Sequence, residues 1–229
     1  MNDFLLFAVV PYLAISCFLL VTIQRYRQRA SSYSTLSSQF LENKRHFWGS
    51  VPFHYGLMAV LAFHFVGVVF PKAVLSWNSA PLRLYILEIS GLALALLSLV
   101  GLLNLISRRL SSKKIRKVTT VGDLVVYLLL TVQIVSGIYV AVYSNWGSSW
   151  FASNASPWLW SLARLDPQVQ YMAAMPLAVK IHVINAFLLI GFFPFTRLVH
   201  VLVVPNHYLW RRTQVVLWNY DRTKVRSGK

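Results

Sequence analysis

Charged residues and cysteine are both scarce in this sequence, and each shortage excludes a class of protein. Charged side chains make up 12% of the 229 residues and hydrophobic ones 57%, whereas soluble domains carry about 25% charged residues. A chain this apolar must use lipid as its solvent over most of its length. The single cysteine, Cys17, lies in an apolar run. It excludes an intramolecular disulfide and any iron–sulfur or zinc site built from thiolates.

Acidic residues are also rare, with 6 Asp and Glu against 22 Lys and Arg. A basic excess often indicates nucleic-acid binding, but here the basic residues flank the apolar runs. This distribution favours roles in membrane orientation and in binding anionic lipid headgroups. We therefore expect the lipid bilayer as a partner and no nucleic acid.

Five apolar runs each approach the ~20 residues that a helix needs to cross a bilayer. They lack the alternating polarity of membrane barrels, so helices are the only spanning option. The predicted fold class is an all-α membrane protein, a single domain over residues 1–229 built as a bundle of five transmembrane helices. The spans are expected at residues 4–23, 51–70, 84–106, 124–143 and 177–204, followed by a short tail at 205–229.

Basic side chains indicate the orientation of the bundle. They concentrate after the first run, after the third run and in the tail, whereas the alternate segments hold only Lys72, Arg83 and Arg164. The positive-inside rule then places the N-terminus outside a prokaryotic cytoplasmic membrane and the C-terminus in the cytoplasm. The segment between the fourth and fifth runs is external by the same rule, and its tryptophans suit a membrane interface. These are Trp146, Trp150, Trp158 and Trp160.

Four histidines lie inside apolar runs: His54 and His64 in the second, and His182 and His200 in the fifth. An ionisable residue in a membrane span is costly, and it is a functional candidate for that reason. A single histidine of this kind could simply form an interhelical hydrogen bond. Two pairs on two helices favour a shared function instead.

Helix geometry and depth pair these histidines. Because the second and fifth helices run antiparallel, His64 is matched in depth with His182, and His54 with His200. On an unbroken helix, His182 and His200 would project from one face about 27 Å apart along the helix axis, because they are 18 residues apart. His54 and His64 would be only ~15 Å apart along theirs. Helix tilt and haem orientation would have to absorb this difference. Facing imidazoles can hold haem iron from both sides, so the bundle is expected to hold two b-type haems. Structural zinc, the main rival, needs four close ligands.

Several longer motifs resemble the cytochrome b, or gamma, subunit of membrane-bound respiratory nitrate reductase. They are SSQFL at 37–41, the segment from Phe53 to His64, TTVGD at 119–123, and the stretch from Lys180 through PFTRLVH at 194–200. The resemblance covers nearly the whole chain. It implies five helices, an external N-terminus and two bis-histidine haems. It also implies docking of the cytoplasmic face onto an iron–sulfur subunit that feeds a molybdenum catalytic subunit, both on separate chains.

The resemblance further implies a quinol site near the outer haem. The family has a basic residue at the outer end of the third helix, and Arg83 stands there where lysine is expected. Arginine keeps the charge but changes the donor geometry. Glu88, about one and a half turns further along, could either neutralise Arg83 or accept a quinol proton.

Cations near the histidines are candidates for binding haem propionates. We expect Lys180 to serve the outer haem and Arg109 the inner one, with Arg197 as a further candidate. Each could instead extend to lipid headgroups. Glycines in the spans are expected to let a haem or a helix approach closely. They are Gly56, Gly67, Gly101, Gly137 and Gly191.

Together these features predict an electron-transfer subunit. Quinol is oxidised near the outer face, and electrons pass from the haem of His64 and His182 to the haem of His54 and His200. They leave through the cytoplasmic face, with nitrate as the expected terminal acceptor. One alternative is an anchor for a selenate, chlorate or sulfite-pathway reductase or a nitrite oxidiser, and electron flow could also be reversed. Another is a histidine-lined transporter, although internal repeats and broken helices are not evident.

Overall fold

The computed structural model describes residues 3–28, 44–144 and 147–198, and over these residues the chain is helical without a β-strand. Five helices are long and apolar enough to cross a membrane, which confirms the expected set. They are α1 (Val10–Gln28, preceded by a π-helical turn at Leu5–Val9), α2 (Lys44–Val69), α4 (Pro81–Ser111), α6 (Val121–Tyr143) and α10 (Leu177–Phe192).

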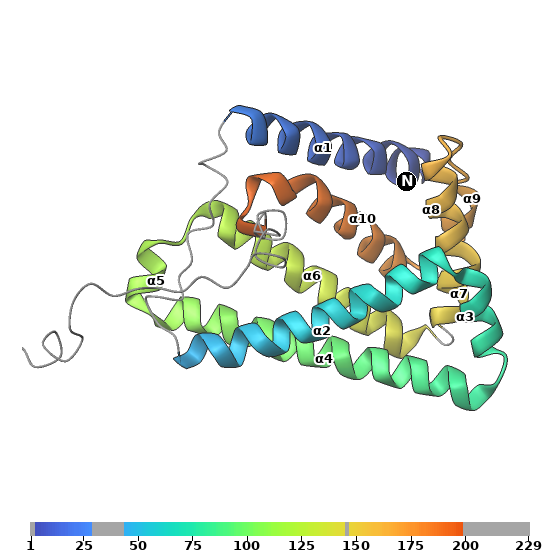
Figure 1. Ribbon diagram of the computed structural model, residues 1–229, viewed down its shortest axis with the longest axis horizontal. Helices are drawn as coiled ribbons and strands as arrows, with labels where there is room; N and C mark the ends of the chain where they lie inside the picture. The colour runs from blue at the N-terminus through green and yellow to red at the C-terminus, as the bar shows by residue number, and fades with distance from the viewer. Residues whose placement is uncertain (1–2, 29–43, 145–146, 199–229) are drawn as a thin grey trace, which may run out of the picture.

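Shorter helices connect the long ones at the two ends of the bundle. Helix α2 packs on α4, and α1 packs on α10. Helices α4 and α10 both pack on α6. Figure 1 shows α5 at one end and the other short helices at the opposite end, where the N-terminus lies. They are α3 (Pro71–Asn78), α5 (Lys113–Lys117), α7 (Gly147–Trp150), η4 (Phe151–Ala155), α8 (Ser156–Ala163) and α9 (Gln170–Ala173).

Several helices extend beyond their apolar runs. The 31 residues of α4 correspond to roughly 46 Å, against a hydrocarbon core of about 30 Å. Its ends therefore reach the headgroup regions, which explains why Arg109 belongs to the helix. Pro81 occupies its first turn, where the missing N–H costs nothing. Helix α6 begins with a capping box between Thr120 and Asp123, which satisfies backbone donors that the first turn leaves open.

The fifth span differs from the unbroken helix assumed from the sequence. Its α-helix ends at Phe192, a 3-10 turn covers Phe193–Phe195, and Thr196 is extended with φ −115° and ψ 173°. Pro194 contributes to this break because it has no N–H to donate to the preceding turn, although Phe193 before it keeps helical backbone angles. The five-turn spacing of His182 and His200 therefore does not apply. Residues 199–229, with His200, lie outside the described residues.

Helices α2 and α4 approach each other through glycine. A Cβ added at Gly56 would lie 2.5 Å from the carbonyl oxygen of Leu94, and one at Gly101 would lie 2.3 Å from the backbone nitrogen of Phe53. Side chains at these positions would push the two backbones apart. At both positions glycine lets the neighbouring helix approach closely. Close approach of a helix was one of the two roles expected for the glycines in the spans, and close approach of a haem was the other.

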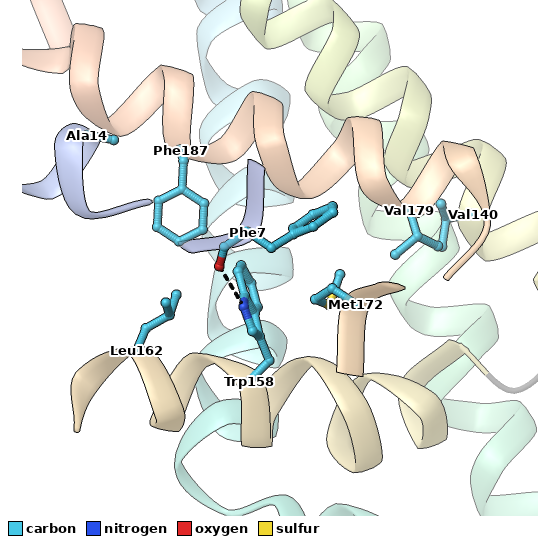
Figure 2. Packing of buried hydrophobic residues seen from close by; sticks show 8 residues of the cluster. All are labelled: Phe7, Ala14, Val140, Trp158, Leu162, Met172, Val179 and Phe187. Carbon is cyan, nitrogen blue, oxygen red and sulfur yellow. Dashed lines mark hydrogen bonds between the residues drawn. The ribbon is translucent and has the colours of Figure 1, made fainter. Parts of the chain in front are cut away.

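A buried aromatic cluster fixes the segment between α6 and α10 onto the bundle (Figure 2). Trp158 is 1% exposed, and its indole N–H donates to the carbonyl oxygen of Phe7 over 2.9 Å. Its ring meets Phe7 and Phe187 edge to face. Trp158 is thus a core residue that faces the protein interior, whereas Trp160 is 43% exposed. The cluster holds the start of the chain and α10 together at the end where the short helices gather.

Candidate functional site

His64 of α2 and His182 of α10 face each other in the bundle. Their ring centroids are 6.3 Å apart, with an angle of 33° between the planes. A metal–imidazole bond is about 2 Å long, so two imidazoles on opposite sides of one metal ion have centroids about 6 Å apart. The observed separation would therefore suit two imidazoles that hold one metal ion between them. The sequence-based depth argument paired these same two residues.

His54 and His64 are held in one tautomer by their own helix, α2. Nδ1 of His64 is 2.8 Å from the carbonyl oxygen of Val60, and Nδ1 of His54 is 2.7 Å from that of Ser50. A carbonyl oxygen only accepts, so each Nδ1 carries the proton and donates it. This leaves the Nε2 lone pair available to a metal, the arrangement usual for metal-binding histidine.

His182 is held by side chains from the neighbouring helix α6. The Ser136 hydroxyl lies 3.0 Å from Nδ1, and the Gln133 amide nitrogen lies 3.1 Å from Nε2. Gln133 is in turn positioned by Asn185, a buried residue whose amide donates to the Gln133 side-chain oxygen over 2.7 Å. Polar groups in an apolar bundle are thereby joined into one network.

The surroundings of the pair are shaped by small and aromatic residues. A Cβ added at Gly137 would lie 2.9 Å from Cε1 of His182, so any side chain there would displace the imidazole. The ring of Phe151 meets that of His64 edge to face at 5.2 Å. These contacts restrict both imidazoles, as a preorganised ligand pair requires.

The second predicted pair is only half described. His54 is exposed on α2, and its ring meets that of Phe53 edge to face at 5.2 Å. The other member, His200, lies outside the described residues. The pairing of His54 with His200 remains a prediction.

The two residues expected at the quinol site do not pair with each other among the described residues. Arg83 donates to the Ser76 carbonyl oxygen and the Ser79 hydroxyl, and its guanidinium lies 5.5 Å from the centre of the Trp77 ring. Glu88 instead accepts from both the backbone N–H and the hydroxyl of Ser148, each at 2.7 Å. Neutralisation of Arg83 by Glu88 is therefore not the arrangement found.

Segment 147–151 connects Glu88 to the histidine pair. Its residue Ser148 holds the carboxylate of Glu88, and three positions later Phe151 contacts the ring of His64. A carboxylate and a candidate metal ligand are thus positioned by the same short stretch of chain. Hydrogen bonds from Asn78 to the hydroxyls of Ser148 and Ser149, at 2.8 and 2.9 Å, hold this stretch against α3.

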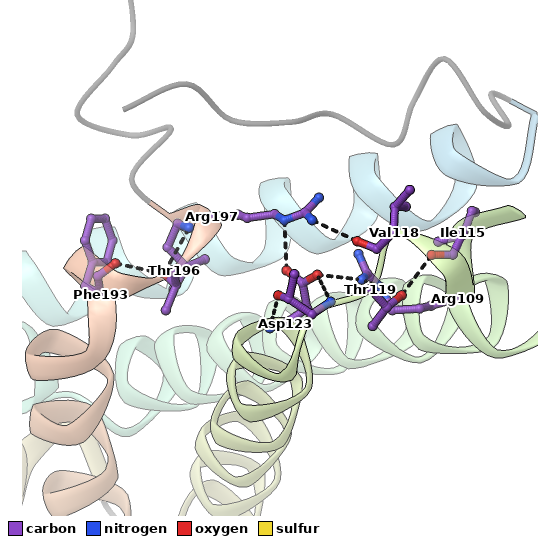
Figure 3. Close-up of polar contacts among 10 residues, drawn as sticks. Arg109, Ile115, Val118, Thr119, Asp123, Phe193, Thr196 and Arg197 are labelled. Carbon is purple, nitrogen blue, oxygen red and sulfur yellow. Dashed lines mark hydrogen bonds and ion pairs between the residues drawn. The ribbon is translucent and has the colours of Figure 1, made fainter. Parts of the chain in front are cut away.

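The two predicted propionate cations each have a carboxylate partner. Lys180 lies 3.4 Å from Asp3. Arg109 donates to Asp123 over 3.0 Å, and Arg197 contacts the other oxygen of the same carboxylate at 3.0 Å (Figure 3). Asp123 is 7% exposed. Two arginines share this single carboxylate, so the cluster keeps a net positive charge.

Comparison with known proteins decides the family. A family model described as the nitrate reductase gamma subunit matches residues 3–219. The chain belongs to this family. It is 31% identical to the nitrate reductase gamma chain of Bacillus subtilis over 92% of this chain and 96% of that one. It is 28% identical to the respiratory nitrate reductase 1 gamma chain of Escherichia coli, over 92% and 95% of the two chains.

A further relative is a longer protein than this chain. The nitrate reductase-like protein NarX of Mycobacterium tuberculosis is 32% identical over 90% of this chain, but the match covers 32% of that protein. The resemblance seen in the motifs is thus confirmed for nearly the whole chain. Membership of the nitrate reductase gamma subunit family implies a membrane subunit that works with catalytic partner subunits on other chains.

Three polar residues at this site of the gamma-family chain were missed by sequence reasoning. Gln133 and Ser136 lie three positions apart in an otherwise apolar run, and Asn185 follows His182 by three. Residues three apart share a helix face, and polar residues inside a span usually mark an interface or a site. The spacing was a usable signal, but only packing shows that both helices present these residues to one another.

Proposed function

We propose that this chain is the dihaem cytochrome b subunit of a quinol:nitrate oxidoreductase. It would oxidise quinol at the end of the bundle where α2 finishes and α4 begins. Electrons would leave at the opposite end for an iron–sulfur subunit that supplies a molybdenum catalytic subunit. The observation that supports this most directly is the facing pair His64 and His182, with ring centroids 6.3 Å apart.

The chain's own residues fit the demands of two haems. His64 and His182 would hold the outer haem through Nε2, and His54 and His200 the inner one. At His182 the lone pair that now accepts from the Gln133 amide at 3.1 Å would bind the iron, so this amide would turn aside. Nδ1 of His54 and Nδ1 of His64 each bond a backbone carbonyl, which orients the ring and raises its basicity as a ligand. Gly137 keeps the space beside His182 free of a side chain. Bound haem would supply one-electron transfer between quinol and the partner subunit.

Cations near the two sites would neutralise propionates. Lys180 stands two residues before His182 and shares its charge with Asp3 at 3.4 Å. At the other end Arg109 and Arg197 together outweigh the one charge of Asp123. The Arg109 Nε is buried and has no hydrogen-bond partner among the described residues. We assign Lys180 to the outer haem and Arg109 to the inner one.

Arg83 and Glu88 would bind quinol and receive its proton. One oxygen of the Glu88 carboxylate accepts both hydrogen bonds from Ser148, so the other oxygen is the candidate acceptor for a hydroxyl proton. Nε of Arg83 is buried without a partner among the described residues, and it could donate to a quinol oxygen. By the positive-inside rule, the positively charged segments at the α5 end would lie in the cytoplasm, and this quinol end would lie at the outer face of the membrane. Protons are then released outside while electrons move inward.

A visible and EPR spectrum of the purified full-length chain tests the proposal. The reduced protein should show b-type bands, and haem extraction should yield two haems per chain with low-spin signals of bis-histidine ligation. A preparation that incorporates no haem, or only one, under conditions of ample haem supply would refute the dihaem assignment.

A further inference from the structure

Two cations from distant parts of the chain line one cavity at the end of the bundle where α2 finishes. Lys72 is the second residue of α3, and Arg164 follows α8. Both line a cavity of about 760 Å³ between the turn at residues 69–73 and the helices α8 and α9. Segments 71–80 and 144–176 hold no other lysine or arginine, so the cations of these connections converge on one place.

Neither cation is committed elsewhere. Among the described residues, the side chains of Lys72 and Arg164 have no ion pair and no hydrogen bond. Both are exposed. Asp166 also lines the cavity, and its carboxylate accepts from Gln168 over 2.8 Å. The cavity therefore carries one net positive charge with a single acidic group.

The walls of the cavity are fixed in place. The indole N–H of Trp160 and the hydroxyl of Ser156 both donate to the carbonyl oxygen of Val68, at 2.8 and 3.1 Å. These bonds tie α8 to the last turn of α2. The Ser161 hydroxyl accepts from the backbone N–H of Gln168 over 2.9 Å, which closes the loop that carries Arg164 and Asp166.

The cavity lies beside the end of the candidate membrane span of α2. Helix α2 ends at Val69, and the next residue, Phe70, is 56% exposed. Trp160 and Tyr171 complete the lining, and such amphipathic rings favour the headgroup layer. An occupant would thus meet both aromatic rings and cations.

The geometry points to a binding site for the headgroup of a membrane phospholipid. Lys72 and Arg164 contact its phosphodiester, and the acyl chains run down past Phe70. Asp166 favours a headgroup with hydrogen-bond donors beyond the phosphate, such as the glycerol hydroxyls of phosphatidylglycerol. The combination of paired cations with an apolar, aromatic wall selects a lipid over a free anion. Nothing in this inference requires haem or quinol.

Photoactivatable phosphatidylglycerol tests the site on the purified full-length chain. The crosslinked lipid should map to residues 69–73 or 156–171. Near a membrane surface each Lys or Arg contributes about 1 kcal/mol, so the double variant K72Q/R164Q should lose roughly tenfold or more of this crosslinking. Because K113Q/K114Q removes two exposed cations of α5 at the opposite end, it is the matched control and should crosslink as the wild type does.

Two further arms separate the lipid from other occupants. Phosphatidylcholine has no net charge and lacks headgroup donors, so it should crosslink less than phosphatidylglycerol, and K72Q/R164Q should reduce this preference. Inorganic phosphate at millimolar concentration should not displace the lipid. Crosslinks that map elsewhere, an equal loss in both double variants, or displacement by phosphate would each overturn the proposal. The wild-type map does not depend on any variant folding.

Discussion

The hydroxyl of Ser136 lies 3.0 Å from Nδ1 of His182, so the two candidate axial ligands of the outer site have different partners. His64 donates to a backbone carbonyl of its own helix, whereas His182 depends on a side chain of α6. A side chain can be removed by substitution, which a backbone carbonyl cannot. This difference makes the outer site open to a specific test.

Replacing Ser136 by alanine should raise the reduction potential of the outer haem. The hydrogen bond to Nδ1 increases the basicity of the imidazole and favours oxidised iron, and a bond of about 1 kcal/mol corresponds to a few tens of mV. Spectroelectrochemical titration measures the shift. Thr131→Val is the matched control, because that hydroxyl donates only to Tyr127 in its own helix over 2.7 Å. An unchanged potential in Ser136→Ala, or an equal shift in both variants, would contradict this role.

Substitutions of the four histidines should separate the two haems. Replacing His64 or His182 by alanine should remove one haem species, and replacing His54 or His200 should remove the other. In the second case quinol should still reduce the remaining outer haem, but the electron should go no further. Optical spectra with and without a quinol analogue distinguish these outcomes. If His54→Ala and His182→Ala lost the same species, the pairing by depth would be wrong.

Glu88→Gln should leave both haems bound and slow their reduction by quinol. A general base typically contributes a factor of about 100 or more, and the amide keeps the size of the side chain without its basicity. Arg83→Gln should act in the same direction by weakening quinol binding. Stopped-flow reduction measures both rates. Ser90→Ala is the control on the same helix, since its hydroxyl donates only to Leu87. Normal reduction rates in the Glu88 and Arg83 variants would show that quinol binds elsewhere in the bundle.

Asp123→Asn should destabilise the fold strongly. Removing the charge leaves Arg109 buried without its counterion, and breaking such a pair costs about 3 to 5 kcal/mol. The side chains of Arg109 and Asp123 are 11% and 6% exposed, so solvent compensates little. Thr120→Ala removes only the helix cap and should cost about 1 kcal/mol. Equilibrium unfolding by SDS titration compares them, and equal losses would show that the ion pair adds nothing beyond the cap.

Topology reporters should place the two ends of the bundle on opposite sides of the membrane. A reporter after the last residue should read cytoplasmic, and one inserted in the segment before α8 should read external, because basic side chains concentrate at the α5 end. The measurement uses two kinds of reporter, one active only in the cytoplasm and one active only outside it. An external C-terminus would reverse the orientation and with it the assignment of outer and inner sites.

The number and type of the membrane helices could be predicted from the sequence by itself. A chain in lipid must satisfy its backbone hydrogen bonds within each span, so a long apolar run admits hardly any other structure. Depth follows from position along such a run, and for this reason His64 and His182 could be matched before any contact was known. Motif similarity supplied the family, and the family model later matched residues 3–219.

Only the tertiary structure decided which way each side chain faces and what it meets. Rotation of a helix about its axis depends on packing against all its neighbours, and local sequence carries little of that information. The sequence therefore did not show that Arg109 is paired with Asp123, or that Trp158 is 1% exposed. Lys72 and Arg164 lie 92 positions apart in the sequence. They line one cavity because hydrogen bonds join α8 to the end of α2. No sequence pattern predicts these hydrogen bonds.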